Sequence, residues 1–298
     1  MSAPRSTRVE VNGWVVLDKP AFTTSTSAVS RLKFLMNAKK AGHAGTLDPL
    51  ATGILPIAFG EATKTVPFVQ DGEKAYRFTI AWGAETNSDD AEGEVTATSE
   101  QRPSAQQVEA LLPHFIGEIT QIPPAYSAIK IGGERAYDLA RSGVVLDMPP
   151  RQVTIHALRL VAADDDTATL EAECGKGTYV RAIARDLGRA LGCYGHVIAL
   201  RRTRVGPFFE RDAVTFEALE SEGKALMRPL DAGIAEVPSV MVDRQGAAQL
   251  RRGQALILRG RDAPGDGVIW ASCGGVAIAI GTVEQGMLHP ERVFTTPY

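Results

Sequence analysis

The order of hydrophobic and polar residues along the first 240 positions predicts strands interleaved with amphipathic helices. Strands are expected where apolar and β-branched residues form short segments between turn residues. Helices are expected where apolar residues recur every three or four positions. The expected strands are 11–17, 76–82, 153–161 and 168–174. The expected helices are 25–36, capped by Thr24 or Ser25, 105–112, with Ser104 and Gln107 as a capping box, and 180–191, capped by Thr178.

The pattern changes near Ser239. A short helix over 245–251 is followed by brief strands over 255–258, 268–271 and 276–280, with glycine in the turns between them. The uncharged stretch from Gly267 to Val283 is shorter than the roughly 20 residues that span a bilayer. A Gly-Gly pair splits this stretch, so we interpret it as a β-hairpin. These features predict a small C-terminal β-domain with a boundary near residue 240.

Composition places the chain among ordinary globular proteins. Of its 298 residues, 44% are hydrophobic and 22% are charged, which excludes a disordered chain and a coiled coil. Its three cysteines lie far apart, its five histidines show no metal-ligand spacing, and its first residues lack the apolar segment of a secretory signal. We therefore expect a cytoplasmic protein without a disulfide framework, a zinc site or a membrane span.

The net charge of -3 argues mildly against a nucleic-acid partner, but the local distribution of charge is uneven. Residues 84–100 contain six acids and no Lys or Arg, which we interpret as a solvated loop. Residues 176–204 contain seven Lys and Arg against Asp186 alone. Such a cluster is typical of a phosphate-binding surface, and a merely solvated face is the alternative.

Two side chains are the first candidates for chemistry. Asp48 is the single carboxylate of the loop at 42–53, next to Pro49, whose fixed φ would hold its direction. An Asp-Pro pair that simply forms a turn is the alternative. Arg181 lies in the first turn of a predicted helix, where a cation opposes the helix dipole. An anion that faces Arg181 would offset this mismatch, whereas a solvated Arg would leave it in place.

Five blocks of sequence lie between Asn12 and Phe208. They read NGWVVLDKP, AGHAGTLDPLATGILPIAFGEATK, KAYRF, GKGTYVRAIARDLG and HVIALRRTRVGPF. In content and order they resemble the signature blocks of tRNA pseudouridine synthases of the TruB family. The resemblance implies isomerisation of the uridine at position 55, in the T loop of tRNA, to pseudouridine. One departure is Phe22, because the family usually has glycine in this turn after Asp-Lys-Pro.

The resemblance also implies a fold and its domains. It implies an α+β fold, in which a pseudouridine synthase catalytic domain over residues 1–240 is built on a mixed, largely antiparallel sheet. Residues 241–298 resemble a small RNA-binding β-domain of PUA-like type. The Pro- and Gly-rich segment over about 122–150 resembles a flexible arm that closes over the T loop, although an ordinary surface loop is the alternative. Basic residues of this arm that could reach phosphates are Lys130, Arg135, Arg141 and Arg151.

Individual residues acquire roles from the same resemblance. Asp48 corresponds to the nucleophile, and a base in a folded loop must be flipped out to reach it. Tyr76 corresponds to the aromatic residue that stacks on the target uracil and assists removal of its C5 proton, and Arg181 to the cation that pairs with the catalytic aspartate. The expected substrate-binding residues are His43, Tyr179, Leu200, Lys19, Lys130, Arg141 and Arg202. Because the isomerisation is neither a redox reaction nor a hydrolysis, no cofactor or metal is expected.

Alternatives remain open at this level. Without the resemblance, Tyr76 and Leu200 also fit ordinary core positions, and His43 fits a loop histidine with a local hydrogen bond. The expected partner is the T-arm stem-loop of tRNA, bound by a monomer that needs no protein partner and no membrane. The competing hypothesis is a non-catalytic RNA-binding or tRNA-folding protein. Asp48 discriminates between the two, because a binding protein needs no nucleophile in that loop.

Overall fold

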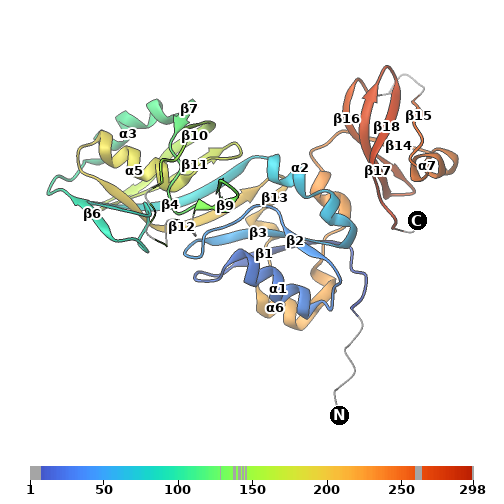
Figure 1. The fold of residues 1–298 in the computed structure, drawn as a ribbon, viewed down its shortest axis with the longest axis horizontal. Coiled ribbons are helices and arrows are strands. Elements are labelled where there is room, and N and C mark those ends of the chain that lie inside the picture. The colour runs from blue at the N-terminus through green and yellow to red at the C-terminus, as the bar shows by residue number, and fades with distance from the viewer. Residues whose placement is uncertain are drawn as a thin grey trace, which may run out of the picture.

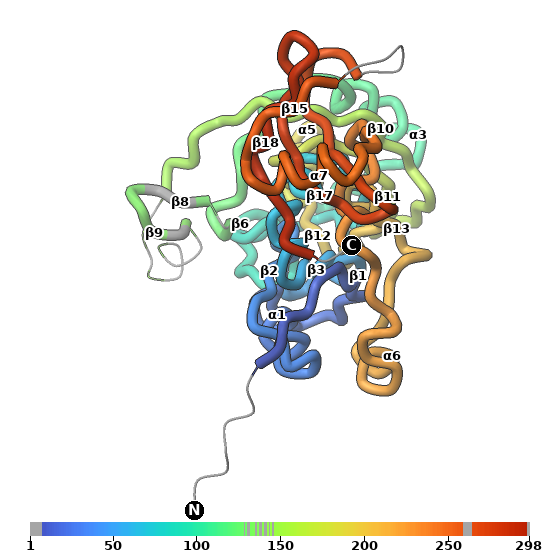
Figure 2. The backbone as a smooth tube through the Cα atoms, turned by 90° about the vertical axis from the view of Figure 1, so that its right-hand side faces the viewer, coloured from blue at the N-terminus to red at the C-terminus, as the bar shows by residue number. Residues whose placement is uncertain are grey.

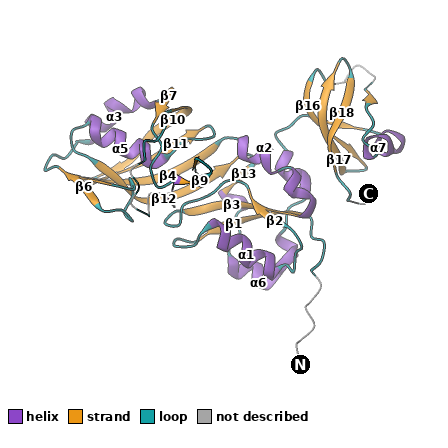
Figure 3. Ribbon diagram, in the orientation of Figure 1, coloured by secondary structure: helices purple, strands orange, loops and turns teal. Residues whose placement is uncertain are grey.

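Two sheets of unequal size dominate the fold (Figure 1). The computed structural model describes residues 8–127, 129–136, 146–258 and 264–296, together with Leu139, Ser142 and Val144. The larger sheet lies in the first 210 residues and the smaller one is formed by the C-terminal residues. Figure 3 shows the strands of both sheets in orange. Within the part of the chain described, no helix is long and apolar enough to cross a membrane.

The larger sheet has nine strands, with the main order β1-β3-β12-β4-β11-β10-β7. Along this path the bounds are β1 Gly13–Lys19, β3 Thr52–Phe59, β12 Gly195–Val205, β4 Lys74–Trp82, β11 Thr167–Cys174, β10 Arg151–Ala163 and β7 Gly117–Gln121. The short strands β2 (Ala41–His43) and β13 (Phe208–Phe209) pair with β3 and β12. All neighbours are antiparallel except β3 and β12, which are parallel. The mixed, largely antiparallel sheet is thus confirmed.

Two-stranded ribbons and helices complete the part of the chain that contains the larger sheet. The ribbons are β5 (Ala84–Thr86) with β6 (Val95–Thr98) and β8 (Lys130–Ile131) with β9 (Glu134–Arg135). The α-helices are α1 Ser25–Leu35, α2 Val66–Asp71, α3 Ala105–Leu111, α5 Val180–Ala190 and α6 Phe216–Glu222. Short 3-10 helices are η1 Gly60–Lys64, η2 Leu112–Phe115, η3 Glu210–Asp212, η4 Gly223–Leu226 and η5 Leu230–Ile234. Leu32 of α1 and Leu187 of α5 are fully buried in the same hydrophobic core, which also contains Phe78 of the sheet.

Local capping signals were read correctly for two helices and wrongly for a third. Thr24 caps α1, and the predicted capping box at the start of α3 is present. At the start of α5, however, the N-cap residue is Tyr179, without a side-chain cap, and not Thr178. The hydroxyl of Thr178 instead donates to the carbonyl oxygen of Gly175 in the preceding turn. The side-chain amide of Gln121 in β7 bonds both the N–H and the C=O of Tyr179 and so anchors this helix end.

The C-terminal sheet has the order β14-β16-β17-β18-β15. Its strands are β14 Ser239–Met241, β16 Gly267–Cys273, β17 Val276–Glu284, β18 Met287–Val293 and β15 Leu256–Ile257, and α7 (Arg244–Arg251) packs beside them. The predicted hairpin is β16 and β17, joined by two glycines with positive φ. In Figure 2 the molecule is turned so that this C-terminal domain faces the viewer. Phe294 is fully buried in one cluster with Trp14 and Ile234, so the two parts of the chain share a core.

Candidate active site

One row across four neighbouring strands holds three of the predicted site residues. In the register of the sheet, Lys19 of β1 faces Gly53 of β3, Gly53 faces Arg202 of β12, and Arg202 faces Tyr76 of β4. Gly53 has a φ of +95°, and a Cβ atom at this position would collide with the Arg202 carbonyl oxygen. The close parallel approach of β3 and β12 therefore requires glycine here, and it brings residues that are distant in sequence to one place.

Arg202 holds the loop that precedes β3 and contains Asp48. This guanidinium is almost fully buried and donates to the carbonyl oxygens of Ile54 at 2.8 Å, Thr46 at 3.1 Å and Gly45 at 3.2 Å. Buried guanidinium groups require such acceptors. The sequence-based prediction that Arg202 binds substrate conflicts with this burial, because its donors are directed to the loop. We therefore assign Arg202 to the positioning of the loop.

Lys19 of β1 holds the same loop from the other side of β3. Its ammonium group is fully buried and donates to the carbonyl oxygens of Pro20 at 2.9 Å, Thr23 at 2.8 Å and Pro49 at 3.2 Å. Burial lowers the pKa of Lys19 to about 8, and the nearby Asp48 carboxylate acts in the opposite direction. Lys19 thus joins the turn after β1 to the residue that follows Asp48, which is the structural support expected at the floor of the site, and is not exposed to contact substrate directly.

Asp48 forms an ion pair with Arg181, with 3.1 Å between Oδ2 and Nε. The side chain of Asp48 is 35% exposed, whereas that of Arg181 is 4% exposed. Burial disfavours the charged guanidinium, but the surrounding carboxylates outweigh it and raise the pKa of Arg181. The expectation that an anion faces this first-turn cation is confirmed. The Asp48 carboxylate is therefore accessible to a substrate, whereas its counter-ion Arg181 is not.

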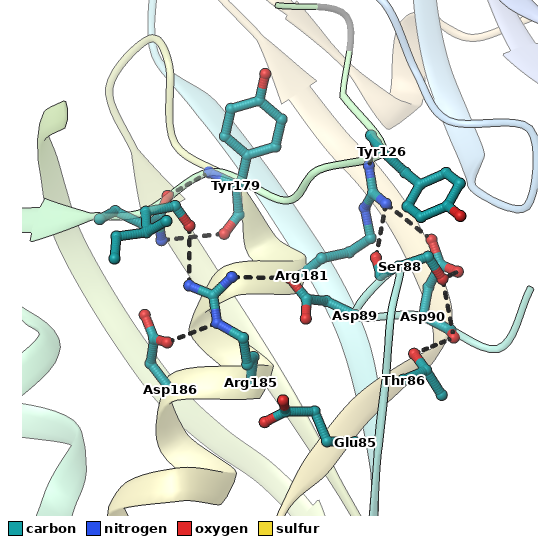
Figure 4. Close-up of polar contacts among 12 residues, drawn as sticks. Glu85, Thr86, Ser88, Asp89, Asp90, Tyr126, Tyr179, Arg181, Arg185 and Asp186 are labelled. Atoms are coloured by element: carbon teal, nitrogen blue, oxygen red, sulfur yellow. Dashed lines mark hydrogen bonds and ion pairs between the residues drawn. The ribbon is translucent and has the colours of Figure 1, made fainter. Parts of the chain in front are cut away.

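Arg181 has further acceptors that sequence reasoning missed (Figure 4). Its Nη1 atom donates to Asp90 Oδ2 at 3.0 Å and to the Ser88 carbonyl oxygen at 2.9 Å, and its Nη2 atom donates to the Tyr126 carbonyl oxygen at 2.8 Å. The buried Asp90 carboxylate also accepts a bond of 2.5 Å from the Ser88 hydroxyl. This network fixes the guanidinium, and through it the carboxylate of Asp48, before any substrate is present.

The acidic segment pairs with successive turns of α5 in reverse order. Asp90 contacts Arg181, Asp89 contacts Arg185 at 2.9 Å, and Glu85 contacts Arg189 at 2.6 Å. The interpretation of 84–100 as a solvated loop is therefore wrong for its first half, where Asp89 and Asp90 are buried. The available signal was a partial match in spacing: three arginines lie four residues apart on one helix, and in the earlier segment Glu85 and Asp89 lie four residues apart, with Asp90 next to Asp89.

The cations of the basic segment 176–204, which the sequence offered for phosphate contacts, also form contacts within the protein. All seven of its cations have partners within the protein. These are Lys176 with Asp71, Arg181 with Asp48 and Asp90, Arg185 with Asp89 and Asp186, Arg189 with Glu85, Arg201 with Asp18 and Glu210, Arg202 with the carbonyl oxygens of Gly45, Thr46 and Ile54, and Arg204 with Glu73 and Glu236. A count of charges along the chain cannot reveal such neutralisation, because the partners come from distant segments.

Asp89 provides a test of this buried charge network. Burial raises the pKa of Asp89 to about 6, well above the value of about 3.9 for an unfolded chain. The folded state then binds this proton more tightly, so the contribution of Asp89 to the free energy of unfolding falls as pH rises from 4 to 6. In Asp89→Asn this pH dependence of the free energy of unfolding should be lost. We expect its free energy of unfolding, relative to wild type, to rise by on the order of 2 kcal/mol between pH 4 and 7.

Urea unfolding at several pH values measures this difference. Asp166→Asn, at a carboxylate whose side chain is 75% exposed, is the control. A difference between Asp89→Asn and wild type that stays constant from pH 4 to 7 would contradict the pKa assignment.

The two predicted site tyrosines lie near Asp48, since its charge acts on the pKa of both. Burial raises the pKa of Tyr76 to about 12, with the Arg202 guanidinium acting in the opposite direction, so the phenol is neutral. Burial also raises the pKa of Tyr179, whose ring packs against Met148 and the other buried residues of the insertion. Tyr76 thus approaches the Asp48 carboxylate from the sheet, and Tyr179 approaches it from the start of α5.

The other predicted residues are distributed less tightly. Leu200 is buried in β12, two positions before Arg202, and it belongs to the main hydrophobic core. His43 ends β2 and leads into the loop that contains Asp48. The backbone of Lys130 lies in β8 of the insertion, whereas its side chain, like the whole of Arg141, lies outside the described residues.

Comparison with solved structures defines the class of fold. The chain is similar to one in the crystal structure of a Cbf5-Nop10-Gar1 complex, with a TM-score of 0.72 and 23% identity over 95% of this chain and 84% of that one. It is also similar to a chain in the structure of an H/ACA RNP bound to a substrate RNA containing 2'-deoxyuridine, with a TM-score of 0.73 and 20% identity over 95% of this chain and 85% of that one. The chain therefore shares its α+β fold with these two structures.

Comparison of sequences identifies the family. Residues 33–180 match the N-terminal domain of TruB family pseudouridylate synthases, and residues 181–234 match the C-terminal domain of tRNA pseudouridylate synthase B. The tRNA pseudouridine synthases B of Rhodopseudomonas palustris and Bradyrhizobium diazoefficiens are 56% and 57% identical, over 98% and 97% of this chain and 83% and 88% of theirs. The chain belongs to the TruB family of pseudouridylate synthases, and it is accordingly an isomerase.

Proposed function

We propose that this protein converts the uridine at position 55, in the T loop of tRNA, to pseudouridine, with Asp48 as the nucleophile. The ion pair of Asp48 with the buried Arg181 carries the proposal, because it presents an oriented and accessible carboxylate. The names of the similar bacterial enzymes, tRNA pseudouridine synthase B, support tRNA as the substrate. A protein that only binds or folds tRNA has no need for a carboxylate held in this way.

The proposed reaction breaks the N1–C1′ bond of uridine, rotates the base and forms a C5–C1′ bond. C5 loses its proton and N1 gains one, so no net charge is transferred. Arg181 holds the Asp48 carboxylate by an ion pair and keeps it aimed at the flipped nucleotide. Tyr76 stacks on the uracil as a neutral phenol and assists the departure of the C5 proton, Leu200 forms a wall of the pocket, and Lys19 and Arg202 support its floor.

Residues at the rim complete the proposed complex with the T-arm. His43 lies beside the flipped nucleotide, and Tyr179 connects the pocket to the insertion. The insertion over about 122–150, with Lys130 and Arg141, acts as the arm that closes over the RNA. Residues 241–298 act as a PUA-like RNA-binding domain, for which the separate C-terminal sheet is the support. Because one chain assembles the site and tRNA is the substrate, we propose a monomer that acts in the cytoplasm.

Tritium release from a T-arm stem-loop tests this function. A labelled 5-³H-uridine at position 55 should release one tritium per RNA molecule, because C5 loses its hydrogen only when the new glycosidic bond forms. The same RNA with the label one position away in the loop is the control. Absence of release from position 55 would refute the isomerase proposal for this substrate, and equal release from both positions would refute its site specificity.

A further inference from the structure

Phe22 is both strained and exposed. Its φ is +58°, in the left-handed region that side chains other than glycine rarely occupy. Its side chain is 82% exposed, so the ring contributes almost nothing to a hydrophobic core. Each feature is unfavourable for folding, and glycine at this position would remove both. A strained residue that the fold itself does not need is an indicator of function.

The turn that contains Phe22 is hydrogen-bonded to the loop at 42–53, which contains Asp48 and is called the catalytic loop below. The Phe22 N–H donates to the carbonyl oxygen of Pro49, the residue after Asp48, at 2.7 Å. The Lys19 ammonium group ties the carbonyl oxygens of Pro20 and Thr23 to that same Pro49 oxygen. The backbone under the aromatic ring is therefore rigid, and a ligand that covers the ring needs to immobilise only two side-chain torsions.

The surroundings favour a nucleobase as this ligand. The cations of 176–204 that the sequence offered for phosphate contacts are already occupied by carboxylates and carbonyl oxygens. Recognition of RNA near Asp48 then depends more on contacts that do not require free charge. Stacking on an exposed aromatic ring is such a contact, and it is available to any unpaired base because every base has a π-face.

We propose that Phe22 is a stacking platform for an unpaired base of the RNA that neighbours the flipped uridine. This inference rests on the proposed function and adds a substrate-positioning residue to it. Phe22 touches a base that does not react, so its contribution belongs to binding and not to the chemical step.

Four variants test the proposal. Phe22→Gly removes the ring and the backbone strain, Phe22→Leu keeps an apolar side chain without a π-face, and Phe22→Trp keeps an aromatic one. Phe34→Ala is the matched control, because Phe34 is 85% exposed on α1, about 13 Å along the helix axis from Ser25, which contacts the catalytic loop. The measurements are KM and kcat for the T-arm stem-loop, binding to the Asp48→Asn form of each variant, and Tm.

Phe22→Gly and Phe22→Leu should raise KM and Kd by about 5-fold or more, with kcat changed less than about 2-fold. Phe22→Trp and Phe34→Ala should stay near wild type, and Phe22→Gly should raise Tm by roughly 2 °C. With an abasic nucleotide beside the target, tested on either side in turn, the effect of Phe22→Gly should vanish on one side.

Other outcomes would overturn the proposal. An unchanged KM and Kd for Phe22→Gly, in an enzyme with normal turnover, refutes stacking by Phe22 and leaves the proposed function intact. An equal loss for Phe34→Ala, or a Tm lowered by Phe22→Gly, gives the ring a general or structural role instead. Failure of the wild-type enzyme to release tritium refutes the proposed function itself, so the two failures are distinguishable.

Discussion

Asp48→Asn is expected to reduce kcat for tritium release by about 10⁴-fold or more, because the amide cannot act as the nucleophile. The fold should tolerate this change. The amide oxygen can still lie against the Arg181 guanidinium, which retains Asp90 and the carbonyl oxygens of Ser88 and Tyr126. Tm and the Kd for the T-arm stem-loop should therefore remain near wild type, which places the whole loss in the chemical step.

Asp18 of β1 provides a closely matched control for Asp48. Asp18 pairs with Arg201 at 3.0 Å, and its side chain is 30% exposed, similar to that of Asp48. Asp18→Asn removes an aspartate charge of similar accessibility from an Arg–Asp pair outside the site, so its kcat should stay within about 3-fold of wild type. If Asp48→Asn releases tritium at the wild-type rate, Asp48 has no part in the mechanism.

Apart from the cap by Thr178, predictions from sequence succeeded where the determinant was local. The cap by Thr24, the capping box of Ser104 and Gln107, and the hairpin over 267–283 depend on residues within a few positions of each other, and the structure confirms each. The anion opposite Arg181 was also accessible to local reasoning, since a cation in the first turn of a helix is unfavourable without one. The fold class and family followed from five blocks of sequence.

Predictions failed where the determinant was a long-range pairing. The acids at 85, 89 and 90 pair with arginines about 100 residues later, and no property of either segment alone reveals the partner. The row that aligns Lys19, Arg202 and Tyr76 depends in the same way on the register of four strands. The burial of Arg202 follows from this register. Its donors therefore hold the loop that contains Asp48, whereas the sequence-based expectation was a contact with substrate.

Arg181→Met should cost both turnover and stability. The substitution leaves Asp90 buried without its cation, and removing one partner of a buried pair typically costs about 3–5 kcal/mol. It also removes the group that holds Asp48, so kcat should fall strongly. The affinity for the T-arm stem-loop should stay near wild type, because the guanidinium is buried and bound to protein oxygens. Urea unfolding, tritium release and RNA binding measure the three effects.

A second variant separates the two losses. In Arg181→Met with Asp90→Asn no carboxylate at position 90 is left unpaired, so much of the stability should return. Turnover should not return, because Asp48 still lacks its counter-ion. Recovery of both properties together would mean that Arg181 serves the fold alone. A collapse of RNA affinity in a stably folded double variant would instead make Arg181 a phosphate contact, and the positioning of Asp48 would then need another explanation.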